Sequence, residues 1–157
     1  MPRKYPPDQT LHQLKIWCDR QERCHTQCRE KLSSWGYFGA HAEAIISELI
    51  SLNYLNEQRF ATAFASGRFR IKRWGKNKIK QHLSRLRVSD YCINAALADI
   101  DEEEYLITLN ALIDSYASRL VENNTFIANG KLANYLIRKG WEPDLVWKYI
   151  REKRPQT

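Results

Sequence analysis

The sequence lacks the apolar runs that would place it in a membrane or direct it out of the cell. None of its 157 residues belongs to a stretch near the roughly 18 apolar residues that a membrane span needs. No apolar stretch follows the basic residues near the N-terminus, so a secretory signal is not predicted. We therefore expect a cytoplasmic protein without a membrane partner, whose four cysteines are reduced thiols.

The motifs of common catalytic sites are also missing. The chain has no GxxxxGK loop followed by Ser or Thr, no HExxH and no GxSxG. Its histidines lie far apart in the sequence and have no obvious carboxylate partner for acid–base chemistry. They are His12, His25, His41 and His82. We expect a protein that is not an enzyme and that uses no cofactor.

Proline and glycine are few, at five and six residues, and no alternating strand pattern persists. Apolar residues instead recur every three or four positions, as at Ile79, Leu83 and Leu86, which predicts amphipathic helices. Four polar residues are predicted helix N-caps: Asp8, Asn56, Ser89 and Asp101. The fold class is therefore all-α, with nine helices predicted over residues 8–21, 24–35, 40–52, 56–73, 76–87, 89–99, 101–122, 125–139 and 143–153.

An internal repeat organises these helices. A shift of 53 residues lays 78–97 over 131–150, so that Lys78 falls on Lys131 and Arg85 on Arg138. A backward shift of 33–34 residues aligns the same segment with a third copy that begins at Ile45. Such units predict three tandem three-helix repeats in an elongated, curved array. The expected boundaries are a disordered N-terminus over 1–7, repeats over 8–55, 56–100 and 101–153, and a tail over 154–157.

Acidic residues are absent between positions 68 and 87. This basic segment carries nine cationic side chains: Arg68, Arg70, Lys72, Arg73, Lys76, Lys78, Lys80, Arg85 and Arg87. The whole chain has a net charge of +7, so the remainder is nearly neutral. A concentrated positive segment favours encounters with polyanions or acidic protein surfaces, whereas the simpler alternative is a solvated helix face.

Several motifs in this region resemble those of the RecX family of bacterial recombination regulators. The resemblance spans about residues 15–150, and its specific part is 52–104. The matching motifs are LNYLNEQRFA over 52–61, Trp74-Gly75, Lys78-Ile79, Val88-Ser89-Asp90, the acidic run 99–104, Arg29 to Leu32 with Trp35-Gly36, and Arg138 to Trp141. Asn129-Gly130 departs from the family pattern and is expected to interrupt the helix of the last repeat.

The resemblance implies a non-enzymatic modulator that binds along the RecA–DNA filament. It implies restraint of the ATPase, strand-exchange and coprotease activities of RecA, the expected partner. Phosphate contacts to single- or double-stranded DNA would add affinity without sequence preference. The chain is expected to act as a monomer. A helical DNA-binding protein without a RecA target, or a helical scaffold for another partner, stays an alternative.

The helical repeat selects four of the basic residues as a candidate binding face. At 100° per residue, Lys78 and Arg85 lie to one side of the apolar stripe of their helix. Lys76, Lys80 and Arg87 lie to the other side. Only the first pair recurs in the later repeat, so the predicted filament- and DNA-binding face comprises Lys78, Arg85, Lys131 and Arg138. We expect Arg68 and Lys72 to strengthen its field. The wider set of predicted filament- and DNA-binding residues also includes Arg70, Arg73, Lys76, Lys80 and Arg87.

Two further groups allow a functional and a structural interpretation. Cys18, Cys24, His25 and Cys28 could supply four zinc ligands, but no close CxxC pair is present, and we favour reduced thiols without metal. Trp74 and Phe69 lie among the basic residues and could stack on bases, but we favour packing for Trp74, as for Trp35 and Trp141. Cys92 is predicted to lie in the core. The acidic run 99–104 is predicted to stabilise a helix N-terminus.

Overall fold

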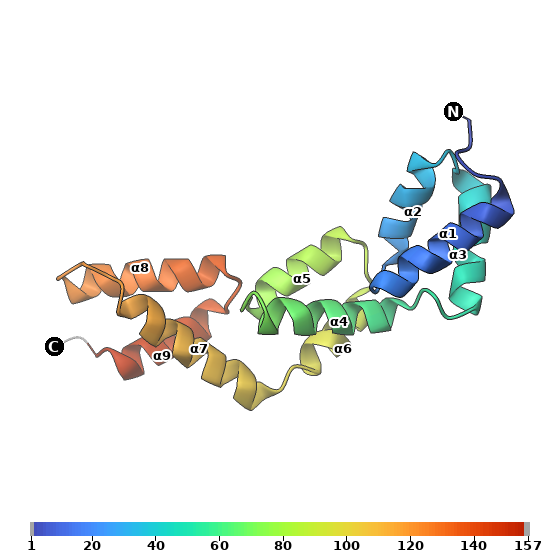
Figure 1. Ribbon diagram of the computed structural model, residues 1–157. Coiled ribbons are helices and arrows are strands. Elements are labelled where there is room, and N and C mark those ends of the chain that lie inside the picture. Colours follow the sequence, from blue (N-terminus) through green and yellow to red (C-terminus); the bar gives the residue numbers. More distant parts are fainter. Residues whose placement is uncertain (1, 156–157) are drawn as a thin grey trace. The chain divides into compact units, whose positions relative to one another are not determined.

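The computed structural model describes residues 2–155, and within them all regular structure is helical (Figure 1). Its helices are α1 (Pro7–Arg20), α2 (His25–Ser34), α3 (Gly39–Ser51), α4 (Glu57–Arg70), α5 (Lys76–Arg85), α6 (Asp90–Ala98), α7 (Glu102–Ala117), α8 (Thr125–Arg138) and α9 (Pro143–Lys153). None of these helices has the length and apolar character needed to cross a membrane. The all-α prediction is confirmed, and the predicted helix bounds agree closely in most cases.

Polar caps fix where several helices begin. The side chain of Asp101 accepts a hydrogen bond from the backbone N–H of Glu104 at the start of α7. Asn56 and Ser89 cap α4 and α6 in the same way. These three predicted caps are confirmed because each oxygen satisfies a backbone donor that the helix leaves free. Asp8 instead lies inside α1, which begins at Pro7 with no side-chain cap.

A left-handed residue follows the second helix of each three-helix repeat. Gly36, Arg87 and Gly140 have φ values of 87°, 60° and 97°. In each case the next backbone N–H bonds back to a leucine carbonyl, at 2.9 to 3.2 Å, which closes the helix C-terminus. The three donor and acceptor pairs are Tyr37 and Leu32, Val88 and Leu83, and Trp141 and Leu136.

These turns fix the register of the repeat. They support the alignment of α5–α6 with α8–α9 that the 53-residue shift predicts. The shift of 33–34 residues is wrong, because it lays α5–α6 over α3–α4 instead of α2–α3. Matches between apolar residues do not distinguish these helix pairs, since every helix of the chain has an apolar stripe.

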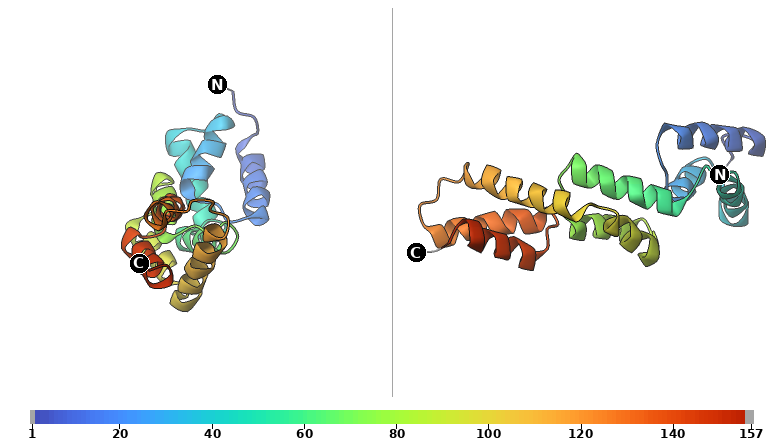
Figure 2. Two further views of the ribbon diagram at one scale, coloured as in Figure 1. Left: turned by 90° about the vertical axis from the view of Figure 1, so that its left-hand side faces the viewer. Right: turned by 90° about the horizontal axis from the view of Figure 1, so that it is seen from below.

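Contacts between Cα atoms divide the chain into two compact units. The first unit contains Met1–Ala63 and Leu83–Ala95, and the second contains Phe64–His82 and Ala96–Thr157. The core of the first unit is built from α1, α2 and α3, with Leu14 and Leu32 fully buried. In the second unit α7, α8 and α9 pack on one another (Figure 2). Each unit thus joins one terminal repeat to part of the middle repeat.

The N-terminal residues are held more firmly than the sequence predicts. Residues 1–7 are expected to be disordered, yet the backbone N–H of Lys4 donates to the carbonyl of Trp35 at 2.9 Å. The ring of Tyr5 meets that of Trp35 edge-on, and its carbonyl accepts from the Tyr37 hydroxyl. Aromatic contacts and hydrogen bonds therefore hold residues 4 and 5, while Met1 lies outside the described residues. Residues 156–157 of the expected tail also lie outside them.

Two helices end three or more residues earlier than predicted. α4 stops at Arg70 because Arg73 adopts a left-handed φ of 58° and the Trp74 N–H turns back to the carbonyl of Arg68. α7 stops at Ala117, because the N–H groups of Arg119 and Leu120 donate to the carbonyls of Tyr116 and Ala117, three residues back instead of four.

In contrast, α8 runs unbroken through Asn129 and Gly130, so the predicted interruption is wrong. Asn129 is buried and exchanges two hydrogen bonds with Arg154, which satisfies its polar side chain within the helix.

Candidate functional site

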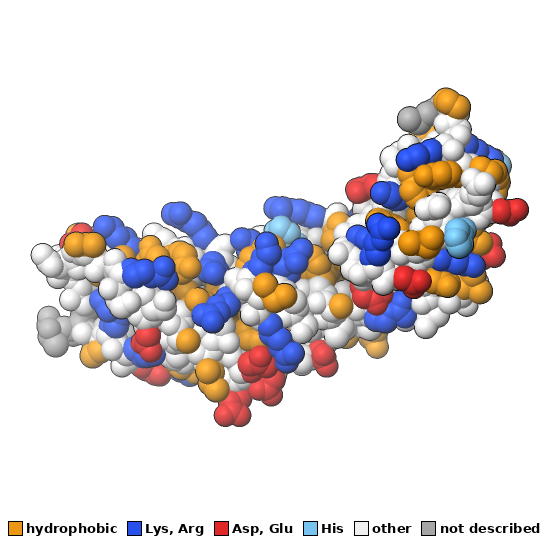
Figure 3. Space-filling view, in the orientation of Figure 1, with side chains coloured by type: hydrophobic (Ala, Val, Ile, Leu, Met, Phe, Trp, Pro, Cys, Tyr) orange, Lys and Arg blue, Asp and Glu red, His pale blue; other side chains and the backbone are white. Residues whose placement is uncertain are grey.

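The basic segment 68–87 covers the end of α4, the α4–α5 turn and α5. Most of the predicted binding residues in it are exposed, and Lys131 and Arg138 are exposed on α8. Only three are partly buried: Arg68, Lys76 and Lys78. Figure 3 shows Lys and Arg side chains gathered over α8 and the beginning of α5, with acidic side chains near the start of α7. The second unit therefore presents a surface that is rich in positive charge.

The α4–α5 turn is held in place by the turn between α8 and α9. The backbone N–H of Gly75 donates to the carbonyl of Lys139, and that of Asn77 donates to the carbonyl of Gly140, both at 2.9 Å. A Cβ atom at Gly75 would lie 2.4 Å from the carbonyl carbon of Gly140, so only glycine fits this approach. The two glycines of the Trp-Gly and Lys-Gly-Trp motifs therefore dock the basic turn on the last repeat.

Aromatic packing also stabilises the contact between the α4–α5 turn and the α8–α9 turn. Trp141 is fully buried, and its Nε1–H donates to the carbonyl of Arg73 at 3.1 Å. The Trp141 ring stacks on Tyr105 with 4.3 Å between centroids. The Tyr105 hydroxyl donates to Glu142 and accepts from the backbone N–H of Lys76. Burial and the Glu142 carboxylate raise the pKa of Tyr105, so its phenol stays protonated and keeps donating.

Acidic residues neutralise only part of the predicted face. Arg70 pairs with Glu104 at 3.3 Å, and Lys76 pairs with Glu102 at 3.4 Å. The acidic run at the start of α7 thus has a second role beside the predicted one at the helix N-terminus. Lys131 pairs with Glu122 at 3.6 Å. Within residues 2–155 the other predicted binding residues have no ion pair: Arg68, Lys72, Arg73, Lys78, Lys80, Arg85, Arg87 and Arg138.

The ring of Trp74 gathers cationic side chains around it. The Nζ atom of Lys78 lies 4.5 Å from the ring centroid and the guanidinium carbon of Arg68 lies 5.5 Å from it. The ring of His82 lies 4.5 Å away. We call Arg68, Trp74, Lys78 and His82 the Trp74 cluster. Trp74 is thus half-buried among cations, whereas the sequence favours packing against a neighbouring helix.

The other aromatic predictions have different outcomes. Phe69 is 2% exposed, so it is a core residue and cannot stack on bases. Packing is confirmed for the buried Trp141 and for Trp35, which lies against the first core. His82 is not among the predicted site residues, because a histidine considered alone gives no sign of its neighbours. The spacing of Trp74, Lys78 and His82, at four-residue steps, is the signal that places them together.

Lys131 and Arg138 flank a hollow of about 210 Å³ on the second unit. Its lining also includes Asn134 and two tyrosines, Tyr116 and Tyr135, whose rings stack in parallel at 4.1 Å. Two cations, an amide and aromatic edges are suited to a polar, negatively charged partner.

The cysteines occupy the first unit, away from the basic segment in sequence. Cys18 lies on α1, Cys24 is the N-cap of α2 and Cys28 lies within α2; all three are buried and free. Burial raises the pKa of Cys18 to about 11 and that of Cys28 to about 12. The described residues contain no group of three or more His, Cys, Asp or Glu placed to hold a metal.

The fourth cysteine, Cys92, is half-buried on α6, which corrects the prediction that it lies in the core. The other three cysteines are buried, so Cys92 is the most exposed of the four.

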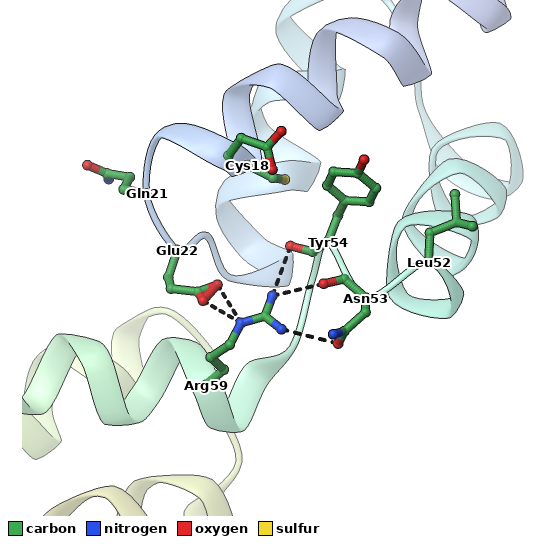
Figure 4. Close-up of a pocket in the computed structure, with 8 residues that line it drawn as sticks. Cys18, Gln21, Glu22, Leu52, Asn53, Tyr54 and Arg59 are labelled. Carbon is green, nitrogen blue, oxygen red and sulfur yellow. Dashed lines mark hydrogen bonds and ion pairs between the residues drawn. The ribbon is translucent and has the colours of Figure 1, made fainter.

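A second hollow, of about 520 Å³, lies in the first unit beside Cys18 and Tyr54 (Figure 4). The Arg59 side chain lines this hollow and forms several hydrogen bonds. Its guanidinium donates to Glu22, to the side chain of Asn53 at 3.1 Å and to the backbone carbonyl of Asn53 at 3.0 Å. These acceptors occupy the arginine, so we assign it a structural role that joins α4 to the preceding turn and to the α1–α2 loop.

The architecture and the surface define a class: a helical-repeat protein whose three-helix units present unpaired basic side chains. The family model described as "RecX, second three-helix domain" matches residues 56–97. The middle repeat of this chain is therefore similar to the second three-helix domain of RecX proteins.

Its relatives include proteins named "Regulatory protein RecX". The one from Clostridium botulinum is 28% identical over 138 residues, and the one from Clostridium tetani is 29% identical over 129 residues. These alignments cover 85% and 79% of this chain. The chain spans only 63% and 58% of the length of these two relatives.

Solved structures show the same fold. The crystal structure of RecX from Lactobacillus salivarius superimposes with a TM-score of 0.83 at 20% identity, over 93% of this chain and 95% of that one. A crystal structure of a regulatory protein RecX gives 0.82 at 17% identity, over 93% of this chain and 71% of that one. The three-helix repeats predicted from the sequence are therefore confirmed as the fold.

Proposed function

We propose that this protein binds the RecA–DNA filament and restrains the ATPase, strand-exchange and coprotease activities of RecA, without catalysing a reaction itself. The similarity to proteins named "Regulatory protein RecX" supports this role, and so does the basic segment. The single observation that carries the proposal is the docked α4–α5 turn, which holds cations at a defined place without acidic partners. A filament of protein and phosphate offers the matching negative charge.

The binding energy in this proposal comes from two sources. Contacts to RecA give specificity, and phosphate contacts add affinity that does not depend on base sequence. Surface cations also raise the association rate with a negatively charged filament. We propose that the protein acts as a monomer in this complex.

A titration of RecA's DNA-dependent ATPase tests the proposal. The protein should suppress hydrolysis at amounts far below those needed to coat the DNA, because a filament regulator acts on many RecA subunits. Binding to the bare DNA is measured in parallel by fluorescence anisotropy, which defines the coating concentration. Suppression that begins only near full coverage would mean competition for DNA and would contradict the RecA target.

The alternative is a helical DNA-binding protein without a RecA target. The hollow beside Lys131 and Arg138, with its stacked tyrosines, favours it because cations beside aromatic rings can bind a nucleic-acid strand without help from RecA. An ATPase of another DNA-dependent enzyme serves as the control. Equal suppression of both enzymes on the same DNA would support this alternative.

A further inference from the structure

We propose that the Trp74 cluster is a binding site for one phosphodiester group of a nucleic-acid strand. This inference rests on the proposed function, in which the basic surface faces the DNA of the filament. It names one site within that surface and assigns its ligand. Four observations carry it: converging cations, missing counter-charges, a buried unpartnered donor and a rigid support.

The cations of the cluster converge on one ring. Lys78 and Arg68 approach Trp74 from two elements, α5 and α4, at 4.5 and 5.5 Å. Arg68 also lies over the ring of Phe64 at 4.5 Å. Cation–π contacts hold both cations at the indole. An anion that contacts both side chains would be attracted by two positive charges.

No carboxylate in residues 2–155 forms an ion pair with either cation. The contrast with neighbouring residues is direct, because Arg70 and Lys76 each have a glutamate of α7. The two cations that meet at Trp74 are thus left with their full charge. An external anion is the ligand that fits.

Arg68 carries a further sign of an incomplete site. Its Nε atom is buried and has no hydrogen-bond partner among the described residues. A buried donor without a partner costs about 1–3 kcal/mol, so native proteins keep few of them. Guanidinium groups bind phosphate oxygens through paired N–H donors, and lysine adds a point charge. A phosphodiester therefore suits the pair of Arg68 and Lys78 in charge and in hydrogen bonding.

The support for the cluster is rigid. Trp74 belongs to the turn that Gly75 docks on the α8–α9 turn, and its own N–H bonds to the carbonyl of Arg68 at 3.1 Å. Lys78 lies in the first turns of α5, next to Gly140. The indole therefore holds the two cations in place before a ligand arrives, which lowers the entropic cost of binding.

The test measures binding of a fluorescein-labelled oligothymidylate by anisotropy, from about 50 to 200 mM salt. R68Q/K78Q should weaken binding at least tenfold at the lower salt. It should also reduce the slope of log K against log salt by about 0.7 for each phosphate of the single strand that the variant no longer neutralises. The matched control is K72Q/K80Q, which removes two exposed, unpaired cations of the same segment and should weaken binding less than threefold.

A second pair of variants tests the ring itself. W74L keeps every charge but removes the indole, so it should weaken binding about fivefold, and W74F should restore most of the loss because it keeps a π face. Circular dichroism and thermal unfolding check that each variant folds. If W74L does not fold, oligonucleotide binding by W74F and by R68Q/K78Q is compared with binding by K72Q/K80Q. Weaker binding by R68Q/K78Q than by K72Q/K80Q then supports the site.

The outcomes separate this inference from the proposed function. Equal losses in the two double variants would mean a diffuse field and would overturn the site. Unchanged oligonucleotide binding by R68Q/K78Q with weakened RecA inhibition would assign the cluster to an acidic protein surface, which also overturns it. Loss of oligonucleotide binding by R68Q/K78Q, in a protein that never restrains RecA, would support the site and contradict the proposed function.

Discussion

Single residues decide how the two turns of the second unit meet. Gly75 makes the closest approach, since any side chain there would run into the backbone of Gly140. Gly67, eight residues earlier in α4, has open space where a Cβ atom would lie. The same substitution at the two glycines should therefore have opposite effects.

G75A should lower the free energy of unfolding by about 1–3 kcal/mol, because the added methyl group separates the α4–α5 turn from the α8–α9 turn. G67A should raise it by about 0.5–1 kcal/mol, because alanine is the better helix former. Urea denaturation followed by circular dichroism measures both. A G75A protein as stable as the parent would mean that the turns do not meet as described.

The buried thiols give a second test at the residue scale. At pH 8 the native protein should react quickly with Ellman's reagent at Cys92 alone, because burial raises the pKa of Cys18 to about 11 and that of Cys28 to about 12. The pKa of Cys24 is also raised by burial. All four thiols should react in guanidinium chloride, and EDTA should leave thermal unfolding unchanged. One tightly held zinc per chain, lost together with helicity, would overturn the interpretation of reduced thiols.

These thiols also determine whether the free energy of unfolding rises or falls with pH. Their folded pKa values lie above the ordinary value of 9.0, so the unfolded chain releases its protons first. The stabilisation is present below about pH 9 and is lost as pH rises toward 11. The free energy of unfolding, measured by urea denaturation, should therefore decrease between about pH 8.5 and about pH 10.5, because unfolding releases protons in this range. A free energy that stays constant or rises there would contradict thiols with raised pKa values.

The turn after the second helix has the same backbone conformation in all three repeats, although its residues differ. The left-handed position after the second helix is glycine in two repeats but Arg87 in the middle repeat. A left-handed conformation costs an ordinary L-residue about 1–2 kcal/mol, a cost that glycine avoids. The turn is closed by a backbone bond from Val88 to Leu83, which does not depend on the Arg87 side chain.

R87G should therefore raise the free energy of unfolding by about 1 kcal/mol, measured by urea denaturation. The control is R85G, which removes an equal charge but places glycine at the end of α5, where it should lower the free energy by up to about 1 kcal/mol. Stabilisation by neither or by both variants would contradict strain at position 87.

Much at the scale of the element could be predicted from the sequence. Apolar spacing and capping residues predict the helices, because both act within a few neighbouring positions. The alignment of the first repeat with the middle repeat could not be predicted. Glycine marks the turn at Gly36 and Gly140, but an arginine adopts the same left-handed backbone at Arg87.

Contacts between segments that are distant in the sequence also could not be predicted from it. The sequence predicts that the basic residues are exposed, but which of them pair with the glutamates of α7 depends on packing. The convergence on Trp74 joins residues of two helices and a turn, and only its spacing of four residues is visible in the chain.

At the scale of the whole molecule, equivalent positions of the repeats predict which charges act together. Lys78 and Arg85 lie two turns apart on α5, and Lys131 and Arg138 lie two turns apart on α8. The corrected register keeps these pairs equivalent, because α5 and α8 are the second helices of their repeats. In a repeat protein, side chains at equivalent positions of successive units serve the same partner. Exposed charges kept only for solubility would show no such preference.

Replacing these four residues by Gln should preserve helicity and weaken RecA inhibition more, per charge removed, than K76Q/K80Q/R87Q. The physical reason is that the second set has no equivalent in the last repeat. Each set contains one paired cation, Lys131 with Glu122 and Lys76 with Glu102, so pairing does not favour either set. The salt dependence of DNA binding should fall by up to about one unit of logarithmic slope for each phosphate that the variant no longer neutralises. RecA ATPase assays and anisotropy titrations on both variants measure these effects. Equal losses per charge would leave a diffuse positive field as the source of binding, because a field responds to the number of charges, whereas a surface built from repeats responds to their positions.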